Sequence, residues 1–486
     1  MRALLIHPTP PRTHWPIGVA HSRWVPSGVA FLAAALRQAG HEVRIHVREE
    51  QLIRNGLDWP AADALLRALL TEFRPEMIGL SLTTPCVPET AFIAKLAREI
   101  LGPRVLIVAG GPHPTAVPES MFRDCPDLDA VIVGEGEETI VELLEKGCST
   151  SVAGLVFRDG DQVRTTPPRM PPADLDRLAT PATDLFDMSF YAAPSRWMIR
   201  WLELSATNIR TSRGCTNRCL FCAGHLVGGV GLRFHSVDYV VEEIRKAVTR
   251  YGVEAINFDD DTLGGGDRLR ALCEGIRRAD LHRKIRWFGC LRVDQVEPDL
   301  LADMKSAGCI QVEYGFESGS DDALRRLGKS STAELNCRAV ELTRKAGLRI
   351  LADIMVGLPG ETFNDLQATV RFLRWARPDV ISSGRLCPLP GTPIYNRLPQ
   401  AVRDSLDWAS YTYLDHPGFP FNPTAMTDAQ FERAYRHFMK YTIKPQQLRA
   451  LLRDTPADHP AERSRLKRTL ARFILRHPLR ALFVPW

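Results

Sequence analysis

The sequence predicts an α/β protein in which two parallel sheets follow one another along the chain and a helical tail completes it. Its 486 residues are enough for about three domains. Short apolar runs alternate with helical stretches of about 10–20 residues, which is the pattern of parallel sheets covered by helices. Six apolar runs between residues 205 and 415 each end in polar or glycine-rich residues, as in a βα barrel.

Residues 1–148 are expected to form the first unit, a doubly wound sheet. A helix is predicted at 29–39, opened by Pro26-Ser27-Gly28 and ended by Gly40. Ligands of such sheets bind beyond the carboxyl ends of the strands. The predicted strands lie at residues 3–6, 43–45, 77–81, 105–109 and 131–133.

The loops after these strands carry glycines, which let a ligand approach the backbone, and hydroxyls, which supply short donors. No GxGxxG run opens a helix here, so a nicotinamide-binding fold is disfavoured. The candidate ligand-binding residues are Ser81, Thr83, Thr84, Gly110, Gly111, His113, Gly134, Glu135 and Gly136.

Residues 149–204 are expected to be a connector. Runs at 152–157 and 162–166 flank an Asp159-Gly160 turn and predict a hairpin. Several prolines between 167 and 181 then argue against regular structure.

Three cysteines, Cys215, Cys219 and Cys222, stand in the run SRGCTNRCLFCAG. Three thiolates can hold three irons of a [4Fe–4S] cluster. Because no fourth cysteine is close by, one iron would keep an open position, as catalytic metal sites do. Two other interpretations stand beside this one: a zinc site completed by His225, or three buried cysteines.

Residues 205–415 are expected to form the second unit, with strands at 207–211, 255–258, 285–288, 311–316, 350–356 and 381–385. The cysteine spacing, Phe221, and the runs GFESGS, DIMVGLPGE and LCPLPGTPIY resemble the radical S-adenosylmethionine (radical SAM) superfamily. The resemblance implies a partial (βα)6 barrel, a [4Fe–4S] cluster on the three cysteines, SAM on the open iron, and an electron donor such as flavodoxin or ferredoxin. The implied SAM contacts are Phe221, Asp259, Asp260, Asp261, Glu317, Ser318 and Gly357.

Two of these contacts have an ordinary structural interpretation as well. The acidic run at 259–261 suits the ammonium of SAM, but Asp also favours helix N-caps. The Gly357 run is also typical of a strand-to-helix turn.

The run PSGVAFLAAALRQAGHEV, the GGPHPT loop and the GEGE run resemble the cobalamin-binding domain that precedes many radical SAM domains. The resemblance covers residues 1–148 and implies that the nine loop residues named above contact cobalamin. The DxHxxG signature does not occur, so no histidine is assigned to cobalt. Some relatives keep this domain without binding cobalamin.

The two domains together resemble cobalamin-dependent (class B) radical SAM methyltransferases. The resemblance implies methylation of an unactivated carbon of a small-molecule or lipid-like substrate by way of a deoxyadenosyl radical and methylcobalamin. One alternative is a radical SAM oxidative cyclase or ring-rearranging enzyme. A non-catalytic cobalamin sensor is another, although a sensor needs no open iron site.

The segment 416–486 is expected to be helical and basic. From Lys440 onward it has eleven basic and three acidic residues, while the whole chain carries a net charge of +5. Leu466, Leu470, Phe473 and Ile474 recur at helical spacing. This predicts either a helix packed on the barrel or a peripheral contact with an anionic membrane surface, and no motif predicts nucleic-acid binding.

The sequence shows no signal peptide and no apolar stretch long enough to span a bilayer. It therefore predicts a cytoplasmic protein, with the inner membrane face as the place of any peripheral contact. The other eight cysteines are scattered and are expected in the core, with Cys86 as the exception because it follows a ligand-side strand.

Overall fold

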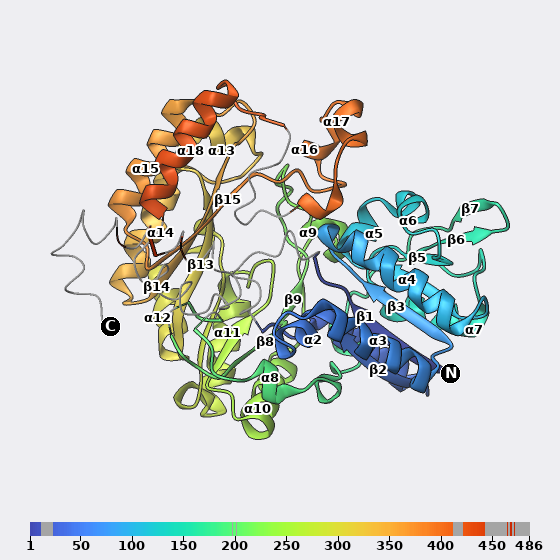
Figure 1. Ribbon diagram of the computed structural model, residues 1–486. Helices are drawn as coiled ribbons and strands as arrows, with labels where there is room; N and C mark the ends of the chain where they lie inside the picture. Colours follow the sequence, from blue (N-terminus) through green and yellow to red (C-terminus); the bar gives the residue numbers. More distant parts are fainter. Residues whose placement is uncertain are drawn as a thin grey trace.

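The computed structural model describes residues 1–10, 23–196, 198–200, 202–411 and 421–442, together with residues 464, 467, 468 and 471. Two α/β units lie side by side, the N-terminal one in blue and cyan and the second in green to orange (Figure 1). The predicted fold class is thus confirmed for both units. Most of the basic C-terminal segment lies outside the described residues, so both interpretations of it stay predictions.

The first sheet has seven strands in the order β2-β1-β3-β4-β5-β6-β7. The first five of these are parallel, whereas β6 is antiparallel to β5 and forms a hairpin with β7. The hairpin predicted in the connector therefore continues the first sheet. The strands are β1 (Arg2–His7), β2 (Glu42–Val47), β3 (Met77–Ser81), β4 (Leu106–Gly110), β5 (Ala130–Ile132), β6 (Leu155–Asp159) and β7 (Gln162–Thr165).

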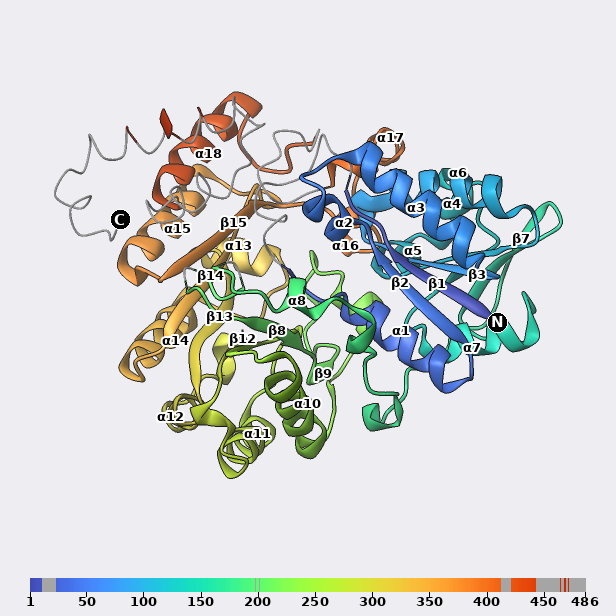
Figure 2. The same ribbon diagram turned by 60° about the horizontal axis from the view of Figure 1, so that its bottom comes forward.

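Helices cover both faces of this sheet, as a doubly wound fold requires. Figure 2 shows α1 (Ser27–Gln38) and α7 (Glu137–Lys146) below it, and α3 (Trp59–Phe73), α4 (Val87–Leu101) and α6 (Pro118–Asp124) above it. Each face has its own apolar core. Residues at the carboxyl ends of β1, β3 and β4, and in the loop after β5, line a cavity together with residues of the second unit, so this edge of the sheet faces that unit.

The second sheet is a curved wall of six parallel strands in the order β15-β14-β13-β12-β11-β8. These are the six strands predicted from the sequence. They are β8 (Ala206–Ile209), β11 (Ala255–Phe258), β12 (Arg286–Cys290), β13 (Cys309–Glu317), β14 (Arg349–Val356) and β15 (Val380–Arg385).

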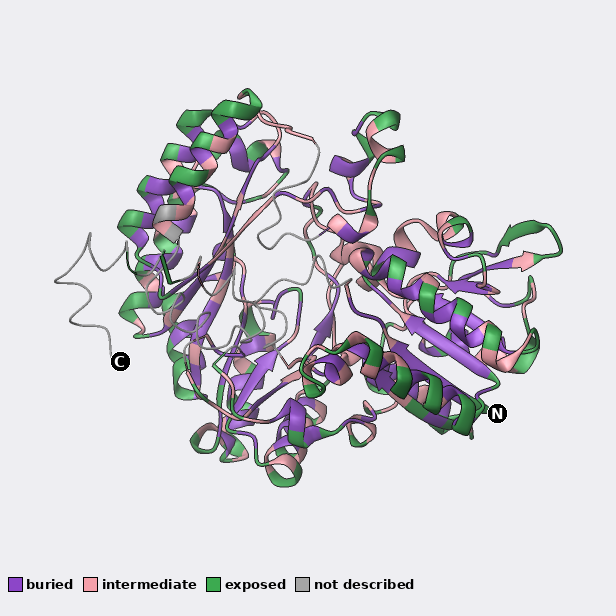
Figure 3. Cartoon of the chain, viewed as in Figure 1, coloured by how far each residue is buried: buried purple, intermediate pink, exposed green. Residues whose placement is uncertain are grey.

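Helices cover the convex face of this wall, so the strands are buried and the outer helix faces are exposed (Figure 3). The last of them, α18, packs on α15. The connector closes the lower end of the barrel, which is the end where β8 and β11 begin. There Met198 and Ile199 pack in one apolar cluster with Phe288. The helices are α10 (Val237–Tyr251), α11 (Gly266–Arg278), α12 (Pro298–Ser306), α14 (Ala333–Lys345), α15 (Phe363–Ala376) and α18 (Asp428–Thr442).

A buried ion-pair network joins the two units. Arg213 of β9 (Ser212–Arg213) lies 3.0 Å from a carboxylate oxygen of Glu135 and 2.7 Å from one of Glu137. Arg233 of β10 (Arg233–Phe234) also pairs with Glu135. The Arg213 guanidinium stacks on Phe31 of α1, 4.7 Å from its ring centre. The GEGE loop of the first unit is thereby fixed to the strand that leads into the cysteine run.

Among the described residues, no helix is both long and apolar enough to span a bilayer.

Removing Arg213 should destabilise the protein strongly, because Glu135 and Glu137 would be left as buried carboxylates without this partner. Arg213→Met is expected to lower the free energy of unfolding by about 3–5 kcal/mol, measured by urea titration. The matched control is Arg196→Met, because the Arg196–Glu203 pair is exposed and worth about 1 kcal/mol or less. Similar losses in both variants would contradict a specific role for the network.

Candidate active site

The cysteine run forms a loop between β9 and α9 (Gly224–Gly228). Gly214 opens it with a positive φ of 87°, and a Cβ there would lie 2.2 Å from the carbonyl oxygen of Gly231. Only glycine fits this position, since any side chain would collide with backbone. The backbone N–H of Gly231 in turn donates to the carbonyl of Cys215 (3.0 Å). These contacts fix the backbone at the first cysteine.

The surroundings of the three sulfurs suit an iron–sulfur cluster. Backbone N–H groups approach the Sγ atoms of Cys215 (3.5 Å) and Cys222 (3.4 Å), as donors to thiolate would. Burial raises the pKa of the Cys219 thiol, while the positive charges of Lys329 and Arg292 oppose that rise. Metal binding supplies the remaining drive to deprotonate these thiols.

A single-ion zinc site is not preformed in the described part of the chain. No three or more His, Cys, Asp or Glu side chains converge there closely enough to hold one metal ion. A [4Fe–4S] cluster does not need such convergence, because each thiolate binds a different iron. The donor set and the amide contacts therefore fit the cluster.

The three consecutive aspartates after β11 have three different environments. Asp259 accepts hydrogen bonds from Ser27 of α1 and from Arg210, which directly follows β8, both at 3.0 Å. Asp260 is buried and accepts from the backbone N–H groups of Thr211 (2.8 Å) and Ser212 (2.7 Å) and from the Thr211 hydroxyl. Burial nonetheless raises its pKa to about 6.

Asp261 forms no hydrogen bond or ion pair with any described residue, and its carboxylate lies beside Gly224 and Gly228 of the cysteine loop. It also lines the central cavity described below, whereas Asp260 does not. Of the three, Asp261 is therefore the carboxylate available to a ligand, and Asp260 holds the strand that leads into the cysteines.

The remaining residues of the predicted SAM site are arranged around the cysteine loop. Glu317 has a positive φ of 61° at a bulge in β13 and pairs with Lys329 (2.9 Å), whose charge acts on Cys219. Ser318 is buried and shares a hydrogen bond with Thr369 (3.0 Å). Phe221 packs in an apolar cluster with Met355 and Leu358.

Gly357 faces α18. It has a positive φ of 78°, and a Cβ there would lie 3.0 Å from the ring of Phe431 on α18. Its N–H donates to the buried carboxyl of Glu361 (2.8 Å). The contacts of Gly357 therefore fit the strand-to-helix turn, which is the alternative to its predicted role as a SAM contact.

A cavity of about 1070 Å³ lies between the two units, and residues of both line it. This exceeds the usual 300–1,000 Å³ of a site for one drug-sized ligand. From the second unit its wall includes Phe221, Cys222, Asp259 and Asp261. From the first unit the predicted residues on its wall are Ser81, Thr83, Thr84, Gly110, Gly111, Gly134, Glu135 and Gly136.

His113 is the one predicted cobalamin residue that does not reach this wall. Its Nδ1 lies 3.2 Å from the hydroxyl of Thr84, its ring meets the edge of Trp408, and burial lowers its pKa to about 4. His113 therefore supports the loop of Thr84 on the side that faces away from the cavity.

Two of the lining residues, Glu135 and Gly111, also have a structural role outside the cavity wall. Glu135 is engaged in the ion-pair network, so it joins the units as well as lining the cavity. A Cβ at Gly111, which has a φ of 104°, would lie 2.8 Å from the carbonyl oxygen of Leu82, so a side chain there would displace backbone rather than simply fill the cavity.

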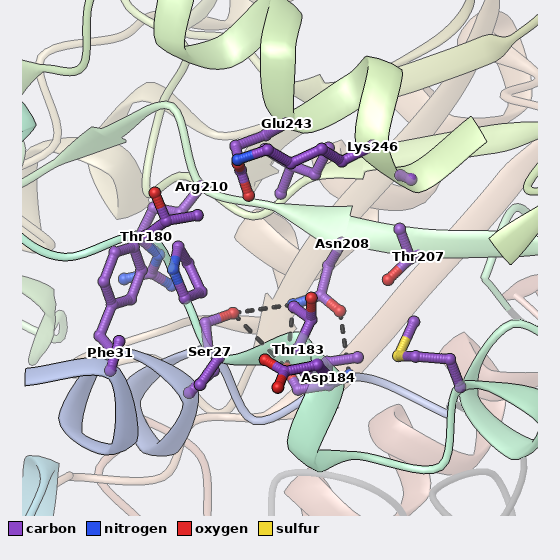
Figure 4. Close-up of a pocket in the computed structure, with 18 of the residues that line it drawn as sticks. Ser27, Phe31, Thr180, Thr183, Asp184, Thr207, Asn208, Arg210, Glu243 and Lys246 are labelled. Atoms are coloured by element: carbon purple, nitrogen blue, oxygen red, sulfur yellow. Dashed lines mark hydrogen bonds and ion pairs between the residues drawn. The ribbon is translucent and has the colours of Figure 1, made fainter. Parts of the chain in front are cut away.

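Sequence reasoning missed the polar contacts where α1 meets β8. Asn208 of β8 exchanges hydrogen bonds with the backbone of Val25 (both 3.0 Å) and donates to Ser27 (2.8 Å). Figure 4 shows Ser27 and Asn208 on the wall of a second cavity, of about 270 Å³, between α1, β8 and α10. The alternating pattern around Asn208 predicts a strand but not these contacts, because the partners of Asn208 lie more than 180 residues away in the sequence.

Comparison with known proteins agrees with this arrangement. Residues 209–373 match the radical SAM superfamily, and residues 14–144 match the B12 binding domain. The solved structure of the radical SAM methyltransferase TsrM from Kitasatospora setae, with cobalamin and a [4Fe–4S] cluster, shares the fold at a TM-score of 0.64 and 19% identity. That likeness covers 83% of this chain and 78% of TsrM.

Two curated relatives extend over most of the chain. An uncharacterized methyltransferase of Pyrococcus horikoshii is 32% identical over 395 residues, covering 80% of this chain and 82% of the relative. The anaerobic magnesium-protoporphyrin IX monomethyl ester cyclase of Cereibacter sphaeroides is 27% identical over 431 residues, covering 85% of this chain and 66% of the cyclase. The chain therefore belongs to the radical SAM enzymes that carry an N-terminal B12-binding domain.

Proposed function

We propose that this protein is a cobalamin-dependent radical SAM methyltransferase that methylates an unactivated carbon of a small-molecule substrate. One observation carries the proposal: the cysteine loop and the glycine-rich loops of the first sheet border the same cavity. Two cofactors bound there would both reach one substrate. We further propose a cytoplasmic enzyme that takes its electron from a donor such as flavodoxin or ferredoxin.

When bound, the cluster supplies the electron that cleaves SAM, and cobalamin carries the methyl group. The chain's own residues bind and orient. Asp261 would hold the SAM ammonium, because its carboxylate lines the cavity, forms no hydrogen bond or ion pair with a described residue, and complements that charge. Lys329 and Arg292 place positive charge beside the cysteine thiolates. The ion-pair network keeps the two loops facing one cavity, and so positions the reacting groups.

The cyclase relative supports a second candidate, a radical cyclisation without net methyl transfer. The two reactions differ in the fate of the SAM methyl group. Product that carries the label of [methyl-¹³C]SAM identifies a methyltransferase, whereas unlabelled product would favour the cyclase.

Cys219→Ala should abolish the cluster and radical formation together. The wild-type protein, reconstituted anaerobically, is expected to hold about four irons per chain and to form 5′-deoxyadenosine from SAM after reduction. The control is Cys337→Ala, at a half-buried cysteine outside the run, which should keep both properties. Undiminished 5′-deoxyadenosine formation by Cys219→Ala would sink the assignment.

Alanine at Asp261 and at Asp260 should give different defects. Asp261→Ala is expected to keep its iron but to bind SAM at least tenfold more weakly, because one hydrogen bond to a charged group is worth about 1.5–3 kcal/mol. Asp260→Ala leaves two buried backbone N–H groups without their acceptor and should lose iron. Iron content and SAM dissociation constants measure this. Unchanged SAM affinity in Asp261→Ala would assign the ammonium to another group.

Gly110→Ile should block cobalamin while leaving the cluster intact. Gly110 ends β4 on the cavity wall, and a Cβ there meets only Ile132, at an ordinary 3.8 Å. A larger side chain would then extend into the cavity. Gly110→Ala is the matched control and should retain more corrinoid. The ratio of corrinoid absorbance to iron is the measurement, and full cobalamin binding by Gly110→Ile would place the cofactor elsewhere.

A further inference from the structure

The concave face of the barrel wall is polar. Successive residues of a strand point to opposite faces. On β13, Val312 and Tyr314 are fully buried against the outer helices, while Glu313 between them is only half-buried. On β14 the same holds for Asp353, which stands between buried Ala352 and Ile354. Glu313 and Asp353 therefore keep part of their surface exposed on the concave face, whereas Met198 and Ile199 cover this face at Phe288.

Two carboxyl groups meet on this face. Glu313 and Asp353 lie on neighbouring strands, and their side chains share a hydrogen bond, to which the hydroxyl of Ser382 on β15 adds another at Asp353. Two carboxyl groups can share a hydrogen bond only if one carries a proton. Burial raises the pKa of both, which agrees with a shared proton.

A third side chain of this face points to a ligand independently. Gln311 precedes Glu313 by two residues on β13, so both face the same side of the sheet. Gln311 is 0% exposed, and neither its amide nitrogen nor its amide oxygen has a hydrogen-bond partner among the described residues. Buried amide groups are normally paired, so this site lacks a partner that a bound molecule would supply.

The charges around the pair show which partner fits. The acids nearby are already matched, Asp259 by Arg210 and Glu317 by Lys329. The positive charge of Arg200, from the segment that closes the barrel, acts on Glu313 and compensates one of the two carboxyl groups. The second carboxyl group is neutralised by the shared proton. A cation entering the barrel would take over that neutralisation and release the proton to solvent.

We propose that Glu313 and Asp353 bind a basic nitrogen group of the substrate, an amine or a guanidine, while the Gln311 side chain bonds a neighbouring polar group. This rests on the proposed function, since it assigns the substrate to the barrel. It adds the chemical class that the barrel selects.

The test compares two probes of equal shape, benzylamine and benzyl alcohol, by equilibrium dialysis against the full chain loaded with cluster, cobalamin and SAM. The wild-type protein should bind benzylamine about tenfold more tightly, and Asp353→Asn and Glu313→Gln should each remove that preference. Both substitutions keep the shape and a hydrogen bond of the pair, so folding should be unaffected. Glu334→Gln, at an exposed glutamate of α14, is the matched control and should retain the preference.

Equal binding of the two probes by the wild-type protein, no binding of benzylamine, or a preference that survives in both variants would overturn the proposal. A SAM dissociation constant that rises tenfold in Asp353→Asn would overturn it too, because the pair would then serve SAM. Formation of 5′-deoxyadenosine by the wild-type protein tests the proposed function separately. Loss of the amine preference with radical formation intact therefore refutes only the substrate class.

Discussion

The buried pairing of Arg213 with Glu135 and Glu137 is the constraint on which the rest of the site depends. It acts two residues before Cys215, and its acidic partners belong to a loop at the carboxyl end of the first sheet. The same contact therefore fixes both the approach of the two sheets and the entry to the cysteine loop. Ion pairs are sensitive to geometry when buried, so the two loops are held in one arrangement.

The arrangement of strands was predictable because it depends on local patterns. Apolar runs at 77–81 and 255–258 coincide with β3 and β11, and all six barrel strands lie where polar ends follow apolar runs. Pairing between strands is less local. The turn at Asp159-Gly160 predicts the β6–β7 hairpin, but nothing in that run shows that β6 joins the edge of the first sheet beside β5.

The roles of the individual acids were not predictable, because each depends on which distant segment arrives beside it. Three consecutive aspartates look equivalent in sequence, yet Asp259 meets Ser27 from 232 residues away and Asp260 meets the strand before the cysteines. His113 likewise turns toward Trp408, which the chain brings back from beyond the barrel. A motif therefore indicates which ligand binds, while the packing decides which of its residues can contact that ligand.

The two faces of the barrel wall differ in polarity. Apolar residues of the wall pack outward on the helices, and Met198, Ile199 and Phe288 close the lower end. Polar side chains such as Glu313, Asp353 and Gln311 are left on the concave face, where an apolar chain would leave them unsatisfied at a cost of about 1–3 kcal/mol each. The substrate proposed above, with a basic nitrogen group, would satisfy them, whereas a purely lipid-like substrate would not.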